Sequence, residues 1–139
     1  MSTEEASRPA RGLLDTTVFI ARESGRPIDA QRLPDESAVS VITIAELRAG
    51  VLAAADSETR ARRLATLESV ADIQALAIDE AAARIWARMR VRLAETGRRV
   101  RINDLWIAAV AAANRLPVVT QDDGFDPVTG VAGLTVIKV

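Results

Sequence analysis

The chain has 139 residues, a formal net charge of −1, 49% apolar residues, and neither histidine nor cysteine. This length and apolar content predict one folded domain. The lack of cysteine excludes disulfide and thiolate chemistry, and the lack of histidine excludes a Ser-His-Asp triad and argues against a zinc site. Because there is no apolar segment typical of a signal peptide or a membrane span, we expect a cytoplasmic protein that does not enter a membrane.

Strand-like and helix-like segments alternate along the chain. In chain order, the first half is predicted to contain a flexible tail at 1–11, a strand at 12–14, a helix at 17–23, a polar loop at 26–36, a strand at 38–42 and a helix that starts at Thr43. In the second half, a helix is predicted at 57–70, with Leu64, Leu67 and Ala71 facing inward, followed by a strand at 73–78. Two further helices are predicted, one capped by Asp79 that ends near Thr96 and one capped by Asn103 that ends near Asn114. A strand at 116–120, a turn-rich loop at 121–130 and a last strand at 134–137 complete the prediction.

This alternation predicts an α/β fold with a mostly parallel sheet covered on both faces, in which ligands bind beyond the carboxyl ends of the strands. Asp15 and Asp122 follow predicted strands, and Glu46 and Asp104 lie in first helical turns, so the fold can gather all four at one edge. Four neighbouring carboxylates repel one another unless a cation neutralises them, and oxygen ligands suit Mg²⁺ or Mn²⁺. The pattern therefore indicates carboxylate-held metal chemistry on phosphate.

Each acid also has a purely structural interpretation. Asp15 could cap the helix that follows it, and Glu46 could complete a capping box with Thr43. Asp104 could complement a helix dipole, although the face that it shares is expected to be buried. Asp122 could be an ordinary turn residue.

The basic residues are almost all arginine, since Lys138 is the only lysine among 18 basic residues. Arg98, Arg99 and Arg101 lie just before Asp104 and could position a phosphate backbone, because arginine binds phosphate in a bidentate manner. The alternative is that they are solvated surface residues.

Four segments in this order resemble the signatures of the PIN-domain ribonucleases, with VapC toxins of bacterial toxin–antitoxin pairs as the nearest group. They are Leu14-Asp15-Thr16-Thr17, Ser40-Val41-Ile42-Thr43-Ile44-Ala45-Glu46-Leu47, Ile102-Asn103-Asp104-Leu105-Trp106-Ile107-Ala108-Ala109 and Val119-Thr120-Gln121-Asp122. The resemblance covers residues 12–139 and implies a three-layer α/β/α sandwich around a short, mostly parallel sheet.

The resemblance also implies an activity, namely metal-dependent endoribonuclease cleavage of RNA phosphodiester bonds. Mg²⁺ or Mn²⁺ would be held mainly by Asp15 and Asp104, with Glu46 and Asp122 completing the acidic site and Thr16 and Thr120 as polar helpers. Many members have an acid at the position of Gly124, so Asp123 is an alternative to Asp122 as the fourth acid.

The partners implied by the resemblance are a VapB-type antitoxin that blocks the site and a second copy of the toxin in a homodimer. An apolar groove beside the acids could receive an antitoxin helix. We expect its lining to come from two predicted helices, through Val18, Phe19, Ile44, Leu47 and Val51.

Two other classes fit the sequence less well. A phosphoacceptor receiver domain would need an acid after its middle strand and a lysine after its last one, and here Asp79 and Lys138 are poorly placed for these roles. A non-catalytic PIN-like scaffold or regulatory protein remains the alternative to the nuclease.

Overall fold

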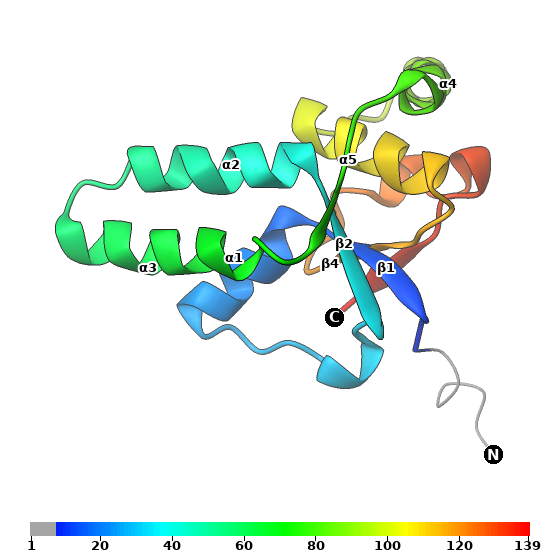
Figure 1. Ribbon diagram of the computed structural model, residues 1–139. Helices are drawn as coiled ribbons and strands as arrows, with labels where there is room; N and C mark the ends of the chain where they lie inside the picture. The colour runs from blue at the N-terminus through cyan, green and yellow to red at the C-terminus, as the bar shows by residue number, and fades with distance from the viewer. Residues whose placement is uncertain (1–7) are drawn as a thin grey trace.

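A five-stranded parallel sheet forms the centre of the computed structural model, which describes residues 8–139 (Figure 1). The strand order is β3-β2-β1-β4-β5. The bounds of the strands are Arg11–Leu14 for β1, Glu36–Ser40 for β2, Gln74–Leu76 for β3, Val118–Thr120 for β4 and Val136–Lys138 for β5. The predicted mostly parallel sheet is confirmed.

Residues 8–139 also form five helices. Their bounds are Thr16–Ser24 for α1, Val41–Leu52 for α2, Ser57–Ser69 for α3, Glu80–Thr96 for α4 and Ile102–Ala113 for α5. Short 3₁₀ turns occur at Ala30–Arg32, Asp126–Val128 and Val131–Gly133. Figure 1 shows α2 and α3 side by side as a hairpin that extends away from the sheet. Across residues 8–139, no helix is long and apolar enough to cross a membrane.

Neighbouring residues of each central strand point to opposite faces of the sheet, because side chains alternate along a strand. In β1, Leu13 packs in a core with α4 and α5, whereas Leu14 packs in a second core with α1 and α2. The pairs Ala38 and Val39 in β2 and Val118 and Val119 in β4 divide in the same way. These two cores define the α/β/α sandwich that was predicted.

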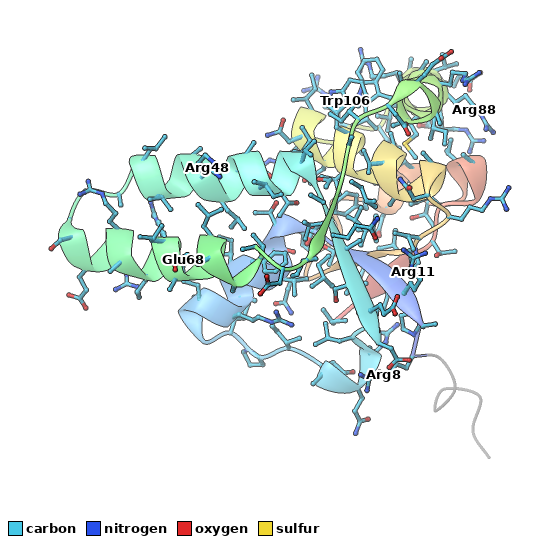
Figure 2. The ribbon with its side chains drawn as sticks, viewed as in Figure 1. Arg8, Arg11, Arg48, Glu68, Arg88 and Trp106 are labelled. Carbon is cyan, nitrogen blue, oxygen red and sulfur yellow. The ribbon has the colours of Figure 1, made fainter. Side chains whose placement is uncertain are left out.

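Two tryptophans join α4 to α5. Trp106 of α5 lies beside α4 (Figure 2), and its ring stacks on Trp86 with 4.9 Å between the ring centroids and 16° between the planes. Parallel aromatic rings at this distance attract one another beyond their burial of apolar area. The pair fixes α5, and therefore its first turn, against the outer helix.

The amino end of the described chain is attached to the sheet. The backbone oxygens of Pro9 and Ala10 accept hydrogen bonds from Asp35 and Glu36, and Arg8 forms a salt bridge of 3.0 Å with Asp35. Arg8 lies near the start of β2 in Figure 2. Residues 8–11 of the predicted flexible tail thus contact β2 and the loop before it, and residues 1–7 lie outside the described residues.

Helix α1 starts one residue earlier than predicted, at Thr16, and the starts of α2 and α5 also differ from the prediction. Helix α2 begins at Val41, and the Ser40 hydroxyl caps it by accepting a 3.2 Å hydrogen bond from the Thr43 amide. The predicted strand at 38–42 was therefore shifted, because β2 begins and ends two residues earlier, at Glu36 and Ser40. Helix α5 begins at Ile102 with Arg101 as its N-cap residue and no side-chain cap, so the predicted cap at Asn103 was wrong.

Helix α3 is less buried than predicted. Leu64 is 43% exposed and Ala71 is also exposed, whereas Leu67 packs partly against the core. The reason is that α3 packs on α1 and α2 rather than on the sheet, so only a narrow stripe of it is covered.

Candidate active site

All four predicted acids line one cleft of about 210 Å³ at the carboxyl ends of β1 and β4. The residues that line it are Asp15, Thr16, Thr17, Ile20, Arg26, Glu46, Arg101, Asp104 and Asp122. The acids come from four separate segments of the chain. They meet in one cleft because parallel strands direct the residues that follow them to the same edge of the sheet.

Asp15 follows β1 directly and is only 1% exposed. Its Oδ1 accepts hydrogen bonds from the Thr17 amide at 3.1 Å and from the Thr17 hydroxyl, and its Oδ2 accepts one of 2.9 Å from the Thr120 hydroxyl. Burial raises the pKa of Asp15 to about 7, although these hydrogen bonds act in the opposite direction, and the charges of Asp122 and Asp104 raise it further. Asp15 also caps α1, which agrees with its alternative structural interpretation, but this role alone does not require a nearly buried carboxyl.

Glu46 lies in the second turn of α2. Its Oε1 accepts a 2.6 Å hydrogen bond from the Thr16 hydroxyl at the start of α1. The capping-box interpretation of Glu46 is wrong, since Ser40 is the N-cap residue and Glu46 lies six positions later. Thr16 is therefore a direct partner of an acid in the cleft.

Asp104 lies in the first turn of α5, on the face that the sequence predicted to be buried. Ile107, Ala108 and Ala111 of that helix are fully buried. Burial, followed by the nearby charges of Asp122 and Glu46, raises the pKa of Asp104 to about 6, while Arg101 lowers it. A carboxyl that only complemented a helix dipole would have a lowered pKa, so the raised pKa favours the acidic-cleft interpretation.

The loop after β4 brings Asp122, and not Asp123, to the cleft. Asp122 Oδ1 accepts a 2.9 Å hydrogen bond from the Gly124 amide. A Cβ atom on Gly124 would lie 3.1 Å from Asp122 Oδ1 and 3.4 Å from Asp104 Oδ2, so both carboxylates adjoin this glycine. Asp123 instead forms an ion pair with Lys138 on the surface.

Of the three predicted arginines, only Arg101 lines the cleft. Arg98 and Arg99 are exposed and do not line it. Arg26 and Thr17 also line the cleft, and neither was predicted as a site residue. Thr17 had a local signal, because a residue two positions after an aspartate often donates to its side chain, whereas Arg26 had none.

The predicted apolar groove is only partly correct. Val18 and Phe19 are buried in the core, and neither lines the acidic cleft or the cavity beside it. Leu47, in contrast, borders a second cavity of about 250 Å³ beside the acids.

The donor set of the cleft fits a hard cation, since its donor atoms are carboxylate and hydroxyl oxygens. Within the described part of the chain, no three acidic side chains converge closely enough to surround one ion. Mg²⁺ usually keeps several water ligands and takes only one or two carboxylates from the protein. Within residues 8–139, neither Asp15 nor Asp104 forms a salt bridge, although Arg101 lies close enough to lower the pKa of Asp104.

Comparison with known proteins agrees with this geometry. Residues 12–131 match the PIN domain. Ribonuclease VapC5 of Mycobacterium tuberculosis is 61% identical over 134 residues, which cover 96% of this chain and 99% of that protein. Ribonuclease VapC4 of the same organism is 42% identical, and the aligned region covers 91% of this chain and 97% of that protein.

Solved structures show the same similarity. The crystal structure of VapBC-5 from Mycobacterium tuberculosis aligns with a TM-score of 0.88 at 60% identity, covering 94% of this chain and 100% of that one. VapBC-1 from nontypeable Haemophilus influenzae aligns with a TM-score of 0.76 at 26% identity, covering 92% of this chain and 97% of that one. The chain therefore belongs to the PIN-domain family and, within it, to the VapC proteins.

Proposed function

We propose that this protein is a metal-dependent endoribonuclease that hydrolyses RNA phosphodiester bonds and acts as the toxin of a VapBC-type toxin–antitoxin pair. The observation that carries the proposal is the cleft in which Asp15, Glu46, Asp104 and Asp122 meet from four separate segments. The ribonuclease activity agrees with the names of two relatives at 61% and 42% identity.

Asp15 and Asp104 would hold Mg²⁺ or Mn²⁺. Such an ion, when bound, acidifies water and offsets negative charge on a phosphate. Thr17 and Thr120 orient Asp15, and Thr16 orients Glu46, through the hydrogen bonds described above.

The chain has no histidine, so a carboxylate of the cleft accepts the proton of the attacking water. Glu46 and Asp122 suit this step, because each keeps one carboxylate oxygen outside the hydrogen bonds of this structure. Arg101 lies in the cleft, where its guanidinium can contact the phosphate backbone.

The partner of the protein in this proposal is a VapB-type antitoxin that covers the cleft. The two aligned structures are of VapBC proteins, which supports such a partner. We also propose that the toxin forms a homodimer and acts in the cytoplasm, where RNA is abundant.

Purified protein freed of antitoxin should cleave RNA with Mg²⁺ or Mn²⁺ and should be inactive in EDTA. The double variant Asp15→Asn/Asp104→Asn should be inactive even with metal. The control is Asp72→Asn, which changes an exposed acid that does not line the cleft and should retain activity. Cleavage by the double variant in EDTA would overturn the metal mechanism. A correctly folded protein without any cleavage would instead favour a non-catalytic scaffold.

A further inference from the structure

A second cavity adjoins the acidic cleft. It has a volume of about 250 Å³ and lies between α1, α2 and α3. Its lining residues are Ile20, Glu23, Glu46, Leu47, Gly50 and Arg63. Since Ile20 and Glu46 also line the acidic cleft, a group in this cavity would lie next to a phosphate held at the acids.

The walls of this cavity are partly apolar. Ile20 and Leu47 present aliphatic surface, and Gly50 presents bare backbone. A Cβ placed on Gly50 would make an ordinary van der Waals contact of 3.8 Å with Arg63 Cδ, so a methyl group fits there but a larger side chain would enter the cavity. Apolar walls beside a phosphate site suit an unstacked base of single-stranded RNA.

Two oppositely charged side chains border the same cavity without pairing. Glu23 Oε1 accepts a 2.8 Å hydrogen bond from the Thr66 hydroxyl, and Arg63 Nη1 donates a 2.7 Å bond to the Gly50 carbonyl. Neither side chain forms an ion pair with any residue between 8 and 139. Each is thus held by one neutral partner, which leaves Glu23 Oε2 and further N–H groups of Arg63 available to a ligand.

We infer that this cavity binds one base of the RNA substrate beside the phosphate that is cut and that it selects guanine. Guanine has N–H donors at N1 and N2 that suit the Glu23 carboxylate, and acceptors at O6 and N7 that suit the Arg63 guanidinium. Adenine has an amino donor in place of O6, and this donor cannot accept from a guanidinium. The inference rests on the proposed function, because it assigns the base that accompanies the phosphate at the acidic cleft.

A pool of RNA with randomised sequence tests this preference in the active protein. Sequencing of the fragment ends after Mg²⁺-dependent cleavage should show guanine enriched about tenfold or more at one position beside the cut, as one bidentate base contact allows. Gly50→Leu fills the cavity and should abolish the enrichment. The control is Gly50→Ala, whose added Cβ makes only an ordinary van der Waals contact with Arg63 Cδ and should keep the enrichment.

Nucleoside binding tests the cavity without cleavage. In metal-free protein with labelled methyl groups, guanosine should shift the signals of Ile20 and Leu47 more than adenosine does. Inosine lacks the N2 amino group and should bind several-fold more weakly than guanosine. Glu23→Gln should remove most of this difference, and Gly50→Leu should abolish the shifts.

The two proposals fail in different ways. Absence of cleavage by the wild type would overturn the proposed function, and the nucleoside titration would still decide the role of the cavity. Metal-dependent cleavage with no guanine preference, or with the same preference in Gly50→Leu, would overturn the base site alone. If Gly50→Leu cleaved RNA like the wild type but no longer bound the antitoxin, the cavity would be a protein-binding surface. This result would also overturn the guanine site.

Discussion

The hydroxyl of Thr16 donates a 2.6 Å hydrogen bond to Oε1 of Glu46 and thereby joins the first residue of α1 to the second turn of α2. The same hydroxyl lies 3.1 Å from the hydroxyl oxygen of Thr43, which is fully buried. These contacts hold the Glu46 carboxylate at the cleft. Groups that orient a catalytic or metal-binding carboxylate typically affect function as strongly as they affect stability.

Thr16→Val should therefore slow RNA cleavage by about 10- to 100-fold, the range found for partners of metal-site ligands. It should lower the free energy of unfolding by only about 1 kcal/mol, because Glu46 is partly solvated and can regain hydrogen bonds from water. Cleavage rates and urea unfolding curves measure the two effects. Thr16→Ser keeps the hydroxyl and should stay near the wild type. Equal rates for the valine and serine variants would exclude an orienting role for Thr16.

Replacement by alanine should have opposite effects on the free energy of unfolding at Gly12 and at Gly50. A Cβ on Gly12 in β1 would lie 2.9 Å from Val119 Cγ2 and 3.2 Å from Pro34 Cγ, so Gly12→Ala should lower the free energy of unfolding by about 1–3 kcal/mol through overpacking. Gly50→Ala in α2 meets nothing closer than 3.8 Å and should raise it by about 0.5–1 kcal/mol, since alanine favours a helix. Urea unfolding in EDTA checks both values. Similar losses for the two variants would contradict the close packing around β1.

The sheet and most helices could be predicted because their apolar periodicity reports burial directly. The start of α2 could not, since Val41 and Ile42 continue the apolar run of β2 and both Ser40 and Thr43 are good N-cap residues. The inward face of α3 was also misjudged at Leu64. Periodicity predicts an apolar face, but the neighbouring elements decide how much of that face is covered.

The acids of the site could be predicted because a carboxylate at the end of a buried strand is costly without a function. The choice between Asp122 and Asp123 depended on the geometry of one turn, which composition does not specify. Arg26 reaches the cleft only because the fold brings the segment after α1 to it. Contacts between distant segments require the tertiary structure.

Like-charge repulsion in the cleft predicts that Asp104→Asn stabilises the metal-free protein. The gain should be up to about 1 kcal/mol after allowance for solvent screening, because Asp104 is partly exposed. The wild type should gain about 2.7 kcal/mol when Mg²⁺ is present at about 100 times its dissociation constant, and the variant should lose most of this gain. Thermal and urea unfolding with Mg²⁺ or with EDTA measure these quantities.

The control for this experiment is Asp72→Asn, which removes the charge of an exposed acid that does not line the cleft. It should respond to Mg²⁺ like the wild type. If Asp104→Asn were less stable than the wild type in EDTA and gained the same stability from Mg²⁺, Asp104 would not belong to a metal site.

The raised pKa of Asp15 predicts an unusual pH dependence of stability in the metal-free protein. The folded carboxyl has a pKa of about 7 against an ordinary value of 3.8, so between these values the folded state binds more protons than the unfolded state. The free energy of unfolding therefore falls as the pH rises through this window and levels off above it. The loss should be on the order of 3 kcal/mol between about pH 5 and pH 8, at 1.36 kcal/mol per pKa unit.

Urea unfolding in EDTA across this range tests the sign, and the absence of histidine from the chain removes the usual side chain that titrates there. Asp104, with its pKa raised to about 6, adds a smaller loss in the same direction. Asp15→Asn should flatten most of the curve, because an amide does not titrate, and saturating Mg²⁺ should flatten it by favouring the ionised carboxylates. A wild-type stability that is constant or rises over this range would show that Asp15 is ionised without cost in the folded protein.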